Sequence, residues 1–554
     1  MRPLHLFFAV AIALLFTLRL VWLPRLNINW DEFLFLMQVH EFARGELLTG
    51  FQTLPARLFA WLPGLADGSI EQAIAARRVM FALGAATAAG VFTLGRTLAG
   101  ATAGWFALLI ALSMSAVLRH GDAFRADPML AFLFITCAVL LVLRPGSPRA
   151  AAVAGAAWAL AAVVSIKAVL YLPALALLLA AAGATPRPAP WRATAAFAGV
   201  AAAGWVALHA WHAAGLAATV AASAVDRAVA VAPAVWLQPR WEVLAETLAR
   251  DWAFWILLAG GAVIAAREAF ALRGDARRRA LSVLALAAPV ASVLVYRNGF
   301  DYFYVTLVPG AAVACGLAVA RLEVWLRPRT RFAGAVLAVL AVPSLAVAAS
   351  FYAAHPDDAT APQRTVLDAV HTLFPQPVPY IDRCGMVVAY PKVGPFMSSF
   401  VLARYRARAT PVMQRLVATQ QPVFVLANVS GLDLARPWSE LSTLRHRLLR
   451  EDFEYLQANY VHHWGPIWVA GRAWSLAAGD TARFDLPVPG RYTVESRAEV
   501  LIDGVAFADG DVLTLTAGEH SLAATGPGPV VLRYGARLAR PNRAPPEGPL
   551  FGGL

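Results

Sequence analysis

The chain has 554 residues, of which 59% are hydrophobic and only 15% are charged, and its mean hydropathy is +0.60. Soluble globular chains carry about 25% charged residues, and the deficit here falls in long apolar blocks, which excludes a soluble domain with a single anchor. The net charge of +13 does not indicate nucleic-acid binding. Most arginines before the C-terminal third lie in short loops between apolar blocks, as in membrane proteins that contact anionic lipid.

About eleven apolar segments are close to the length that a helix needs to cross a bilayer. They are residues 4–23, 79–95, 101–118, 129–143, 150–166, 168–183, 193–211, 252–266, 280–296, 303–320 and 332–352. We interpret the first as a retained span, because Pro24-Arg25-Leu26-Asn27 lacks the small-residue cleavage site of a signal peptide. Lys167 interrupts 150–183, which is either two spans or one broken helix. The pattern predicts a polytopic α-helical membrane domain over residues 1–352.

Arginines orient these spans, because cytoplasmic loops are enriched in positive charge. With the N-terminus in the cytoplasm, the cytoplasmic loops hold Arg96, Arg144, Arg149, Arg187, Arg192, Arg267, Arg273, Arg277, Arg278, Arg279, Arg321, Arg327, Arg329 and Arg331. An odd number of spans then puts everything after Tyr352 outside. The expected location is a bacterial cytoplasmic (inner) membrane, with a periplasmic C-terminal part.

The C-terminal third changes character at His355-Pro356-Asp357-Asp358, where apolar runs become short. The pattern of residues 353–472 predicts an α/β domain, with strands at 378–381, 386–389, 422–427 and 466–470 and helices at 363–373 and 411–419. Thr410 is the predicted N-cap of the second helix. Residues 473–542 predict a small β-sandwich, with strands at 484–488, 492–496, 499–501, 512–515, 521–523 and 530–533. Residues 543–554 are rich in Pro and Gly and predict a flexible tail.

Polar residues gather in four places that the topology puts on the outer face. Asp31-Glu32 opens an amphipathic segment after the first span; carboxylates there also suit the helix dipole, which is a purely structural alternative. Arg119, His120, Asp122, Arg125 and Asp127 precede the fourth span. Capping explains Asp127, but it does not explain arginines in a short outer loop.

The other two places have simpler explanations as well. Lys167 lies between the fifth and sixth spans, where a lysine often snorkels to the interface. Arg297 and Tyr302 lie between the ninth and tenth spans, where aromatic residues are common at the membrane surface. His462-His463 does not predict a metal site, because neighbouring residues of a strand point to opposite faces. Together the four places put acids and bases at the level of a lipid phosphate.

The Asp31-Glu32 pair, the following segment that ends at Arg44-Gly45, and Arg125-Ala126-Asp127-Pro128 resemble the GT-C membrane glycosyltransferases. The order of features is similar over about residues 1–350 to the protein O-mannosyltransferase and lipid A aminoarabinose transferase group, and the outer C-terminal part also fits. The aminoarabinose enzymes carry Lys-Pro-Pro-Leu in the first outer loop, where this chain has Thr53-Leu54-Pro55-Ala56-Arg57-Leu58. The resemblance therefore does not identify the sugar.

The resemblance implies transfer of a sugar from a polyprenyl-phosphate donor to an acceptor glycan, lipid or protein outside the cytoplasmic membrane. Asp31 would be the general base, with Glu32 and Asp122 as alternatives for that role. Glu32 could otherwise orient Asp31 or bind the acceptor, and Asp127 could hold a sugar hydroxyl or orient Arg125. Cations suit the lipid phosphate; the candidates are Arg57, Arg119, Arg125, Lys167 and Arg297. Asp122, His120 and Tyr302 are candidates for acceptor binding or orientation.

These cations would neutralise the leaving phosphate, so no obligatory metal or cofactor is expected. The expected partners are the lipid-linked sugar, the acceptor and membrane lipid, with no nucleic acid. Two alternatives remain. A transporter or flippase would place ionisable residues near the bilayer midplane, and a non-catalytic envelope assembly subunit would not bring Asp31 and Asp127 into one cavity.

Overall fold

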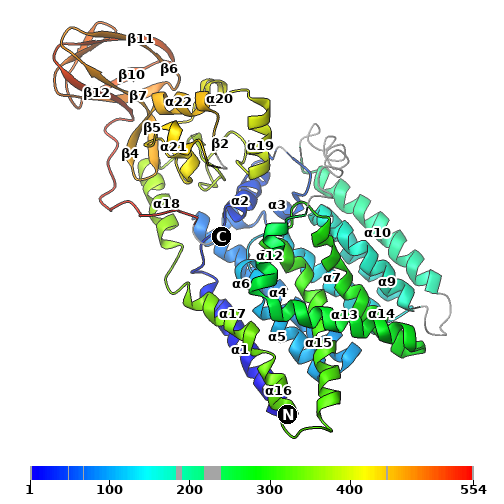
Figure 1. The fold of residues 1–554 in the computed structure, drawn as a ribbon. Coiled ribbons are helices and arrows are strands. Elements are labelled where there is room, and N and C mark those ends of the chain that lie inside the picture. The colour runs from blue at the N-terminus through cyan, green and yellow to red at the C-terminus, as the bar shows by residue number, and fades with distance from the viewer. Residues whose placement is uncertain are drawn as a thin grey trace. The chain divides into compact units, whose positions relative to one another are not determined.

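The structure is a computed structural model that describes residues 3–47, 49–65, 68–182, 190–216, 239–444 and 447–551. Arg187, expected in a cytoplasmic loop, lies outside these residues. The chain divides into two compact units. The first comprises residues 1–26, 38–67 and 71–358, and the second comprises residues 27–37, 68–70 and 359–554. Figure 1 labels helices and strands of both units.

The first unit is helical, and each predicted apolar segment corresponds to one helix or to two consecutive helices. Among the described residues, seven helices or consecutive helix pairs are long and apolar enough to cross a membrane. The helices are α1 (Pro3–Trp22), α3 (Leu54–Leu58), α4 (Ser69–Ala99), α5 (Ala101–Ser113), α6 (Ser115–His120), α7 (Ala126–Leu143), α8 (Pro148–Val164), η2 (Ile166–Tyr171), α9 (Leu172–Ala182), α10 (Pro190–Ala213), α12 (Trp241–Arg250), α13 (Trp252–Ala271), α14 (Gly274–Ala287), η4 (Ala288–Leu294), η5 (Asp301–Phe303), α15 (Tyr304–Leu326), α16 (Ala333–Val339) and α17 (Val342–Ala353). The chain is thus a polytopic helical membrane protein.

Several predicted spans are interrupted where the backbone changes conformation. Met114 is extended, so residues 101–118 form α5 and α6 and not one helix. Ser165 is also extended, and its hydroxyl accepts a hydrogen bond from the Lys167 N–H at 3.4 Å, which ends α8 and begins η2. These interruptions bring polar backbone and side chains to the ends of the helices.

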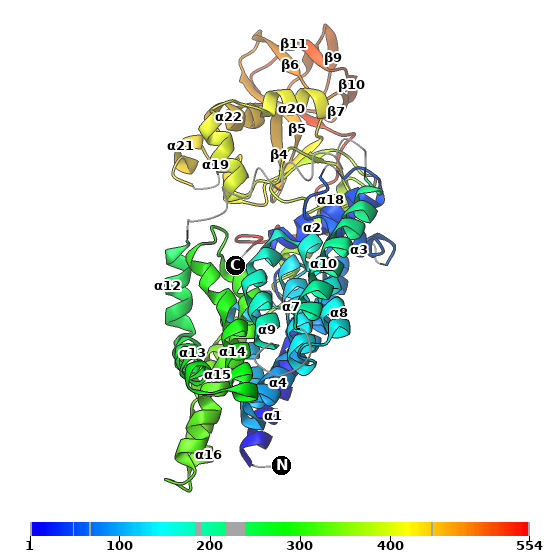
Figure 2. The same ribbon diagram turned by 90° about the vertical axis from the view of Figure 1, so that its right-hand side faces the viewer.

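Helix α15 is the central helix of this unit and is buried along its apolar stretch. Its neighbours approach closely because the contact positions are glycines. A Cβ on Gly261 of α13 would lie 1.9 Å from the Ala314 carbonyl oxygen, and a Cβ on Gly316 would lie 2.4 Å from that of Ala103 in α5. These contacts lie near the middle of α15, and its N-terminal end follows Asp301 and Tyr302 of η5. Helices α8 and α10 run side by side (Figure 2).

The second unit contains two sheets. One has the order β10-β7-β12-β5-β3-β1-β2, with β4 also paired to β5, and the other has the order β6-β11-β8-β9. Among the strands of the described residues, only β1, β2 and β3 are parallel to one another. The strands are β1 (Tyr380–Ile381), β2 (Lys392–Val393), β3 (Phe424–Leu426), β4 (Tyr460–Trp464), β5 (Ile467–Leu476), β6 (Thr481–Leu486), β7 (Gly490–Ser496), β8 (Val500–Ile502), β9 (Val505–Phe507), β10 (Val512–Leu515), β11 (Gly518–Ala524) and β12 (Gly528–Tyr534).

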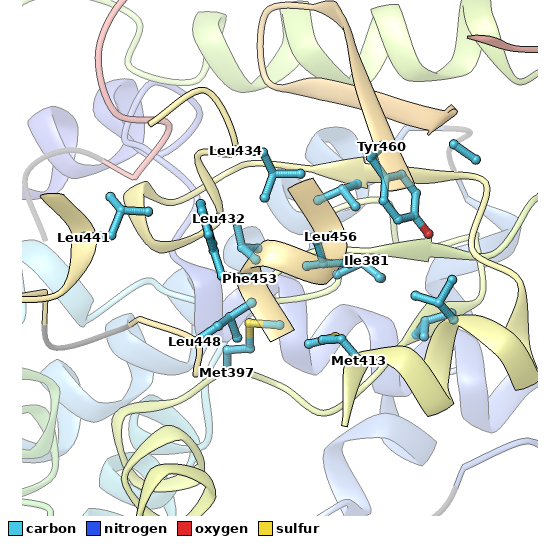
Figure 3. Close-up of a cluster of buried hydrophobic side chains, with 14 of the residues drawn as sticks. Ile381, Met397, Met413, Leu432, Leu434, Leu441, Leu448, Phe453, Leu456 and Tyr460 are labelled. Carbon is cyan, nitrogen blue, oxygen red and sulfur yellow. The ribbon is translucent and has the colours of Figure 1, made fainter. Parts of the chain in front are cut away.

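The parallel strands pack against helices through an apolar core (Figure 3). The helices of the unit are α18 (Ala361–Leu373), α19 (Ser399–Arg408), α20 (Met413–Gln420), α21 (Trp438–Leu441) and α22 (Arg450–Asn459). Ile381 of β1 meets Met413 of α20 and Phe453 and Leu456 of α22 in this core. Residues 386–389, predicted as a strand, form turns instead.

The cap of α20 differs from the prediction of Thr410. The carboxylate of Asp452 in α22 accepts hydrogen bonds from the N–H groups of Val412, at 2.9 Å, and Met413, at 2.7 Å. Thr410 instead donates its hydroxyl to the Arg408 carbonyl at 3.0 Å. A carboxylate from a neighbouring helix thus takes the role that the sequence assigns to the nearest hydroxyl.

The β-rich part is a sandwich whose two sheets share an apolar core. Phe484, Ile502 and Leu522 project from the four-stranded sheet and meet Val494 and Leu532 from the other sheet. Strand β5 pairs with β3 at one end and with β12 at the other, so one sheet runs from the α/β part into the sandwich. Strand β9, which the sequence analysis did not predict, completes the edge beside β8 (Figure 2).

Residues 543–551, predicted to belong to a flexible tail, pack within the second unit. The Leu550 carbonyl accepts hydrogen bonds from the Asn27 amide at 2.9 Å and the Gln363 amide at 3.0 Å. The Phe551 ring contacts Trp30 edge-on, with 6.0 Å between the ring centroids. Apolar and backbone contacts therefore hold a segment whose composition alone favours flexibility.

Candidate functional site

A cluster of buried charges surrounds the first turn of α7. Asp127 accepts hydrogen bonds from Lys167 Nζ at 2.6 Å and from Arg125 Nε at 3.2 Å. The side chains of Asp127, Arg125 and Lys167 are 2%, 5% and 12% exposed. Arg125 precedes α7 in an extended conformation, and Lys167 lies on η2 just after the break at Ser165. We call these three residues the Asp127 cluster; it contains two cations and one anion.

Tyr302 lies beside both cations of this cluster. The Arg125 guanidinium carbon is 3.7 Å from the Tyr302 ring centroid, and Lys167 Nζ is 4.8 Å from it. A cation over a tyrosine ring is attracted by the ring quadrupole. His120 contacts Tyr302 edge-on, with 6.2 Å between the centroids. Burial and the adjacent charges of Arg125 and Arg119 lower the pKa of His120 to about 3, so this imidazole is neutral at physiological pH.

A second group of charges connects α6, α12 and the start of α15. Asp301 accepts hydrogen bonds from Arg119 Nη1 at 3.3 Å and from Arg250 Nη2 at 3.2 Å. Arg250 also donates to the Ser115 hydroxyl at 2.7 Å, and the Asp251 carboxylate accepts from the Ser115 N–H at 3.0 Å. The sequence analysis did not select Arg250 and Asp251, although their position directly before an apolar span is the signal that identified Asp127.

Asp122 is paired separately from the Asp127 cluster. Arg19 donates to it from Nε at 3.0 Å and also from Nη2. The pair fits because its neighbours are glycines; a Cβ on Gly121 would lie 2.9 Å from Arg19 Nη2. The sequence analysis missed Arg19, which lies within an apolar span and has its partner more than a hundred residues away.

Two further predicted cations, Arg57 and Arg297, also belong to the first unit. Arg57 of α3 donates to the carbonyls of Trp211 and His212, and its guanidinium carbon is 4.0 Å from the Trp211 ring centroid. Arg297 is half-buried, and its carbonyl accepts a hydrogen bond from Arg240 Nε at 3.2 Å. Arg240 thus adds a further cation to this part of the first unit.

Asp31 and Glu32 lie in the second unit, at the start of α2 (Trp30–Ala43). The N–H of Asn29 donates to Glu32 Oε1 at 3.0 Å, and the N–H of Asp31 donates to Asn29 Oδ1 at 2.8 Å. This reciprocal arrangement is a capping box. Glu32 is fully buried, whereas Asp31 is half-buried.

Arg383 accompanies Asp31 in the second unit. Its guanidinium carbon is 4.2 Å from the Trp30 ring centroid. Burial lowers the pKa of Arg383, and the negative charge of the Asp31 carboxylate opposes this effect. The backbone N–H of Arg383 donates a hydrogen bond to Asn428 Oδ1 at 3.2 Å, which fixes the backbone after β1. Sequence reasoning missed Arg383 because no recognisable motif surrounds it.

No group of three or more His, Cys, Asp or Glu side chains that could hold a metal occurs among the described residues. His462 and His463 differ in environment, as expected for neighbours on a strand. His462 is exposed, with its Nε2 3.0 Å from the Gly465 carbonyl, and His463 is buried, with its Nε2 3.4 Å from the Ala539 carbonyl.

The helical arrangement and the C-terminal unit match solved structures. The oligosaccharyltransferase of Archaeoglobus fulgidus in the apo form has a TM-score of 0.55 at 12% identity, covering 93% of this chain and 76% of that chain. ArnT from Cupriavidus metallidurans bound to undecaprenyl phosphate has a TM-score of 0.52 at 15% identity, covering 76% and 92%. No protein-family model and no curated protein matches the sequence.

These likenesses establish the fold. The chain is a multi-pass membrane protein with the fold of the GT-C glycosyltransferases, as the short motifs around Asp31 and Asp127 predict.

Proposed function

We propose that this protein transfers a sugar from a polyprenyl-phosphate donor to an acceptor on the outer face of the cytoplasmic membrane. The Asp127 cluster, with its excess positive charge beside Tyr302, is the observation that carries the proposal. One of its fold neighbours was solved with undecaprenyl phosphate bound, which supports a lipid phosphate as the ligand of this fold. The proposed location is the inner membrane, with the second unit in the periplasm.

The cations would act on the leaving phosphate. Arg125 presents a planar guanidinium that suits phosphate oxygens, and Lys167 adds a mobile point charge. Asp127 neutralises one of the two charges and holds both side chains in place, so that one positive charge is left for the ligand. Charge neutralisation of this kind lowers the energy of the departing phosphate without proton transfer. We therefore propose no obligatory metal.

Asp31 is the proposed general base for the acceptor hydroxyl. The capping box of Asn29 and Glu32 orients the first turn of α2, so Glu32 acts through the backbone and not on the substrate. Asp31 remains half-buried beside Arg383, where a carboxylate can accept a proton from a bound hydroxyl. The identity of the sugar is left open, because the first outer loop departs from the aminoarabinose enzymes.

The test compares membranes that hold wild type, Asp31→Asn and the control Asp485→Asn, which removes an exposed carboxylate from β6. Transfer from a radiolabelled pool of polyprenyl-phosphate sugars is measured. Loss of transfer in Asp31→Asn alone is expected, by about a hundredfold or more, the usual contribution of a general base. Equal transfer by all three proteins would remove Asp31 as the base.

Donor binding is tested separately from transfer. Purified wild type and Lys167→Gln are incubated with undecaprenyl phosphate, and the bound lipid is counted by native mass spectrometry. Weaker binding by Lys167→Gln is expected because a charge-assisted contact is lost. Equal binding by the two proteins would show that Lys167 of the Asp127 cluster does not contribute to donor binding. Movement of the lipid across vesicles without any transfer would favour a flippase.

A further inference from the structure

A pocket of about 560 Å³ lies within the second unit. We call it the Trp30–Arg383 pocket. It is lined by Trp30, Arg383, residues 427–430, Asp433, residues 465–466, Trp468, residues 545–546 and residues 548–551. All of these belong to the same compact unit. None is a residue of the Asp127 cluster.

The pocket lies where the strand order changes direction. β1 pairs in parallel with β2 on one side and with β3 on the other. Arg383 follows the carboxyl end of β1, and residues 427–430 follow that of β3. Open parallel sheets bind ligands outside the carboxyl ends of strands whose connections leave in opposite directions. Gly465 and Pro466 lie at the same edge, because β5 begins there opposite the end of β3.

Arg383 supplies a cation with unused hydrogen-bonding capacity. The residue is 5% exposed, and its Nε has no hydrogen-bond partner among the described residues. A buried donor without a partner destabilises the protein unless a ligand satisfies it. Since guanidinium groups match carboxylate and phosphate oxygens geometrically, the complement of Arg383 is an anionic group.

Aromatic side chains form the other part of the pocket. Trp30, Trp468 and Phe551 line it together with Ser430 and Asp433. Ligand sites commonly combine aromatic walls with a few polar groups. The C–H face of a sugar ring packs well on an indole, whereas hydroxyl groups at its edge need the polar residues. A saccharide with a negative charge would use the indole, the polar groups and Arg383 together.

We propose that the Trp30–Arg383 pocket binds the acceptor as an anionic saccharide and presents one of its hydroxyls to Asp31. This inference rests on the proposed function and specifies the acceptor class. Asp31 directly follows Trp30 and interacts electrostatically with Arg383, whose guanidinium stacks on the Trp30 ring, so a ligand bound by Arg383 lies beside the proposed base. Arg383 would serve as a binding residue that selects for negative charge.

The test titrates the full chain in phosphatidylcholine nanodiscs with a hyaluronan tetrasaccharide and, as the neutral probe, with its carboxyl-reduced form. Wild type is expected to bind the acidic probe more tightly. Arg383→Gln should weaken binding of the acidic probe about tenfold or more, the factor that a charge-assisted hydrogen bond contributes. The control Arg450→Gln removes a 66% exposed arginine and should leave binding unchanged.

Two further measurements keep the result interpretable. Cys384 is fully buried next to Arg383, so its protection from a thiol dye reports whether Arg383→Gln still folds there. If Arg383→Gln proves unfolded, Trp468→Ala replaces it and should weaken binding of both probes. Absence of binding to wild type, or wild-type binding of the acidic probe by a folded Arg383→Gln, would overturn the proposal.

The pocket and the proposed function can fail independently. Asp31→Asn should still bind the acidic probe, and somewhat more tightly, because a neighbouring negative charge is removed, while sugar transfer is lost. Charge-selective binding without transfer by wild type would support the pocket and refute the transferase function. Transfer by wild type without charge-selective binding would support the transferase function and refute the proposed role of the pocket.

Discussion

Replacing Asp127 by asparagine tests whether the Asp127 cluster is an ion-pair network that holds the first unit together. The substitution preserves shape but turns a cluster of net charge +1 into one of net charge +2. Both cations lose a partner at 2.6 Å and 3.2 Å, and their side chains are only 12% and 5% exposed. Removing one member of a buried pair typically costs about 3–5 kcal/mol, since the remaining charge stays desolvated.

The double variant Asp127→Asn/Lys167→Met separates electrostatics from packing. It returns the cluster to one cation, so it should recover roughly 1–3 kcal/mol of the loss, the range of coupling between residues in one network. Lys167→Met alone should cost less than Asp127→Asn alone, because Asp127 keeps Arg125 as a partner.

Unfolding of this unit can be followed through its own thiols. Cys137 and Cys315 are buried within α7 and α15 and react with a thiol dye only when the helices separate. A Cys384→Ser background removes the signal of the second unit. If Asp127→Asn became reactive to the dye at the same temperature as wild type, the ion-pair network would be refuted. If the double variant were no more stable than Asp127→Asn alone, the excess positive charge would not be the cause of the lost stability.

Three further predictions concern other features. His120→Gln should lose less stability than wild type between about pH 6.5 and pH 3, because the buried histidine has a lowered pKa and binds fewer protons in the folded than in the unfolded protein. Unfolding temperatures of wild type and His120→Gln are measured across this range, and an equal fall in both would contradict the prediction. Asp452→Ala should cost about 1–2 kcal/mol in chemical denaturation by uncapping α20, and an unchanged midpoint would show that the cap is dispensable. Gly465→Ala should lower the free energy of unfolding by more than the backbone strain of about 1–2 kcal/mol expected at φ +47°, because its Cβ would lie 2.8 Å from Pro545. The control is Gly510→Ala, at φ +80° with nothing within 4 Å of its Cβ, and equal losses of stability in the two variants would exclude a steric contribution.

The helical unit was largely predictable because each span is an apolar run of sufficient length. The Asp127 cluster was predictable in part for the same reason, since polar residues between two such runs are conspicuous. Arg125 and Asp127 were selected from one loop and Lys167 from another, and the structure brings the three together. Tyr302 was also selected, and it lies over the same cations.

Two of the failures share a physical cause, which is a partner distant in sequence. Arg19 looks like an isolated charge in an apolar run until Asp122 is placed beside it. Asp452 replaces the hydroxyl of Thr410 as a cap from another helix. Local composition cannot reveal either contact. Glu32 illustrates the opposite case, since its role as a cap follows from Asn29 only three residues earlier and was available from the sequence.

The packing of residues 545–551 beside Trp30 has a consequence for biogenesis. These residues leave the ribosome after every strand of the second unit, whereas Trp30 is among the first to be made. Domains usually begin to fold during synthesis, from the N-terminal side. The wall that these residues contribute to the Trp30–Arg383 pocket therefore forms only after translation of the sheets is complete. A translation product that stops before residue 545 would insert its helices and fold its strands, yet would lack a closed pocket.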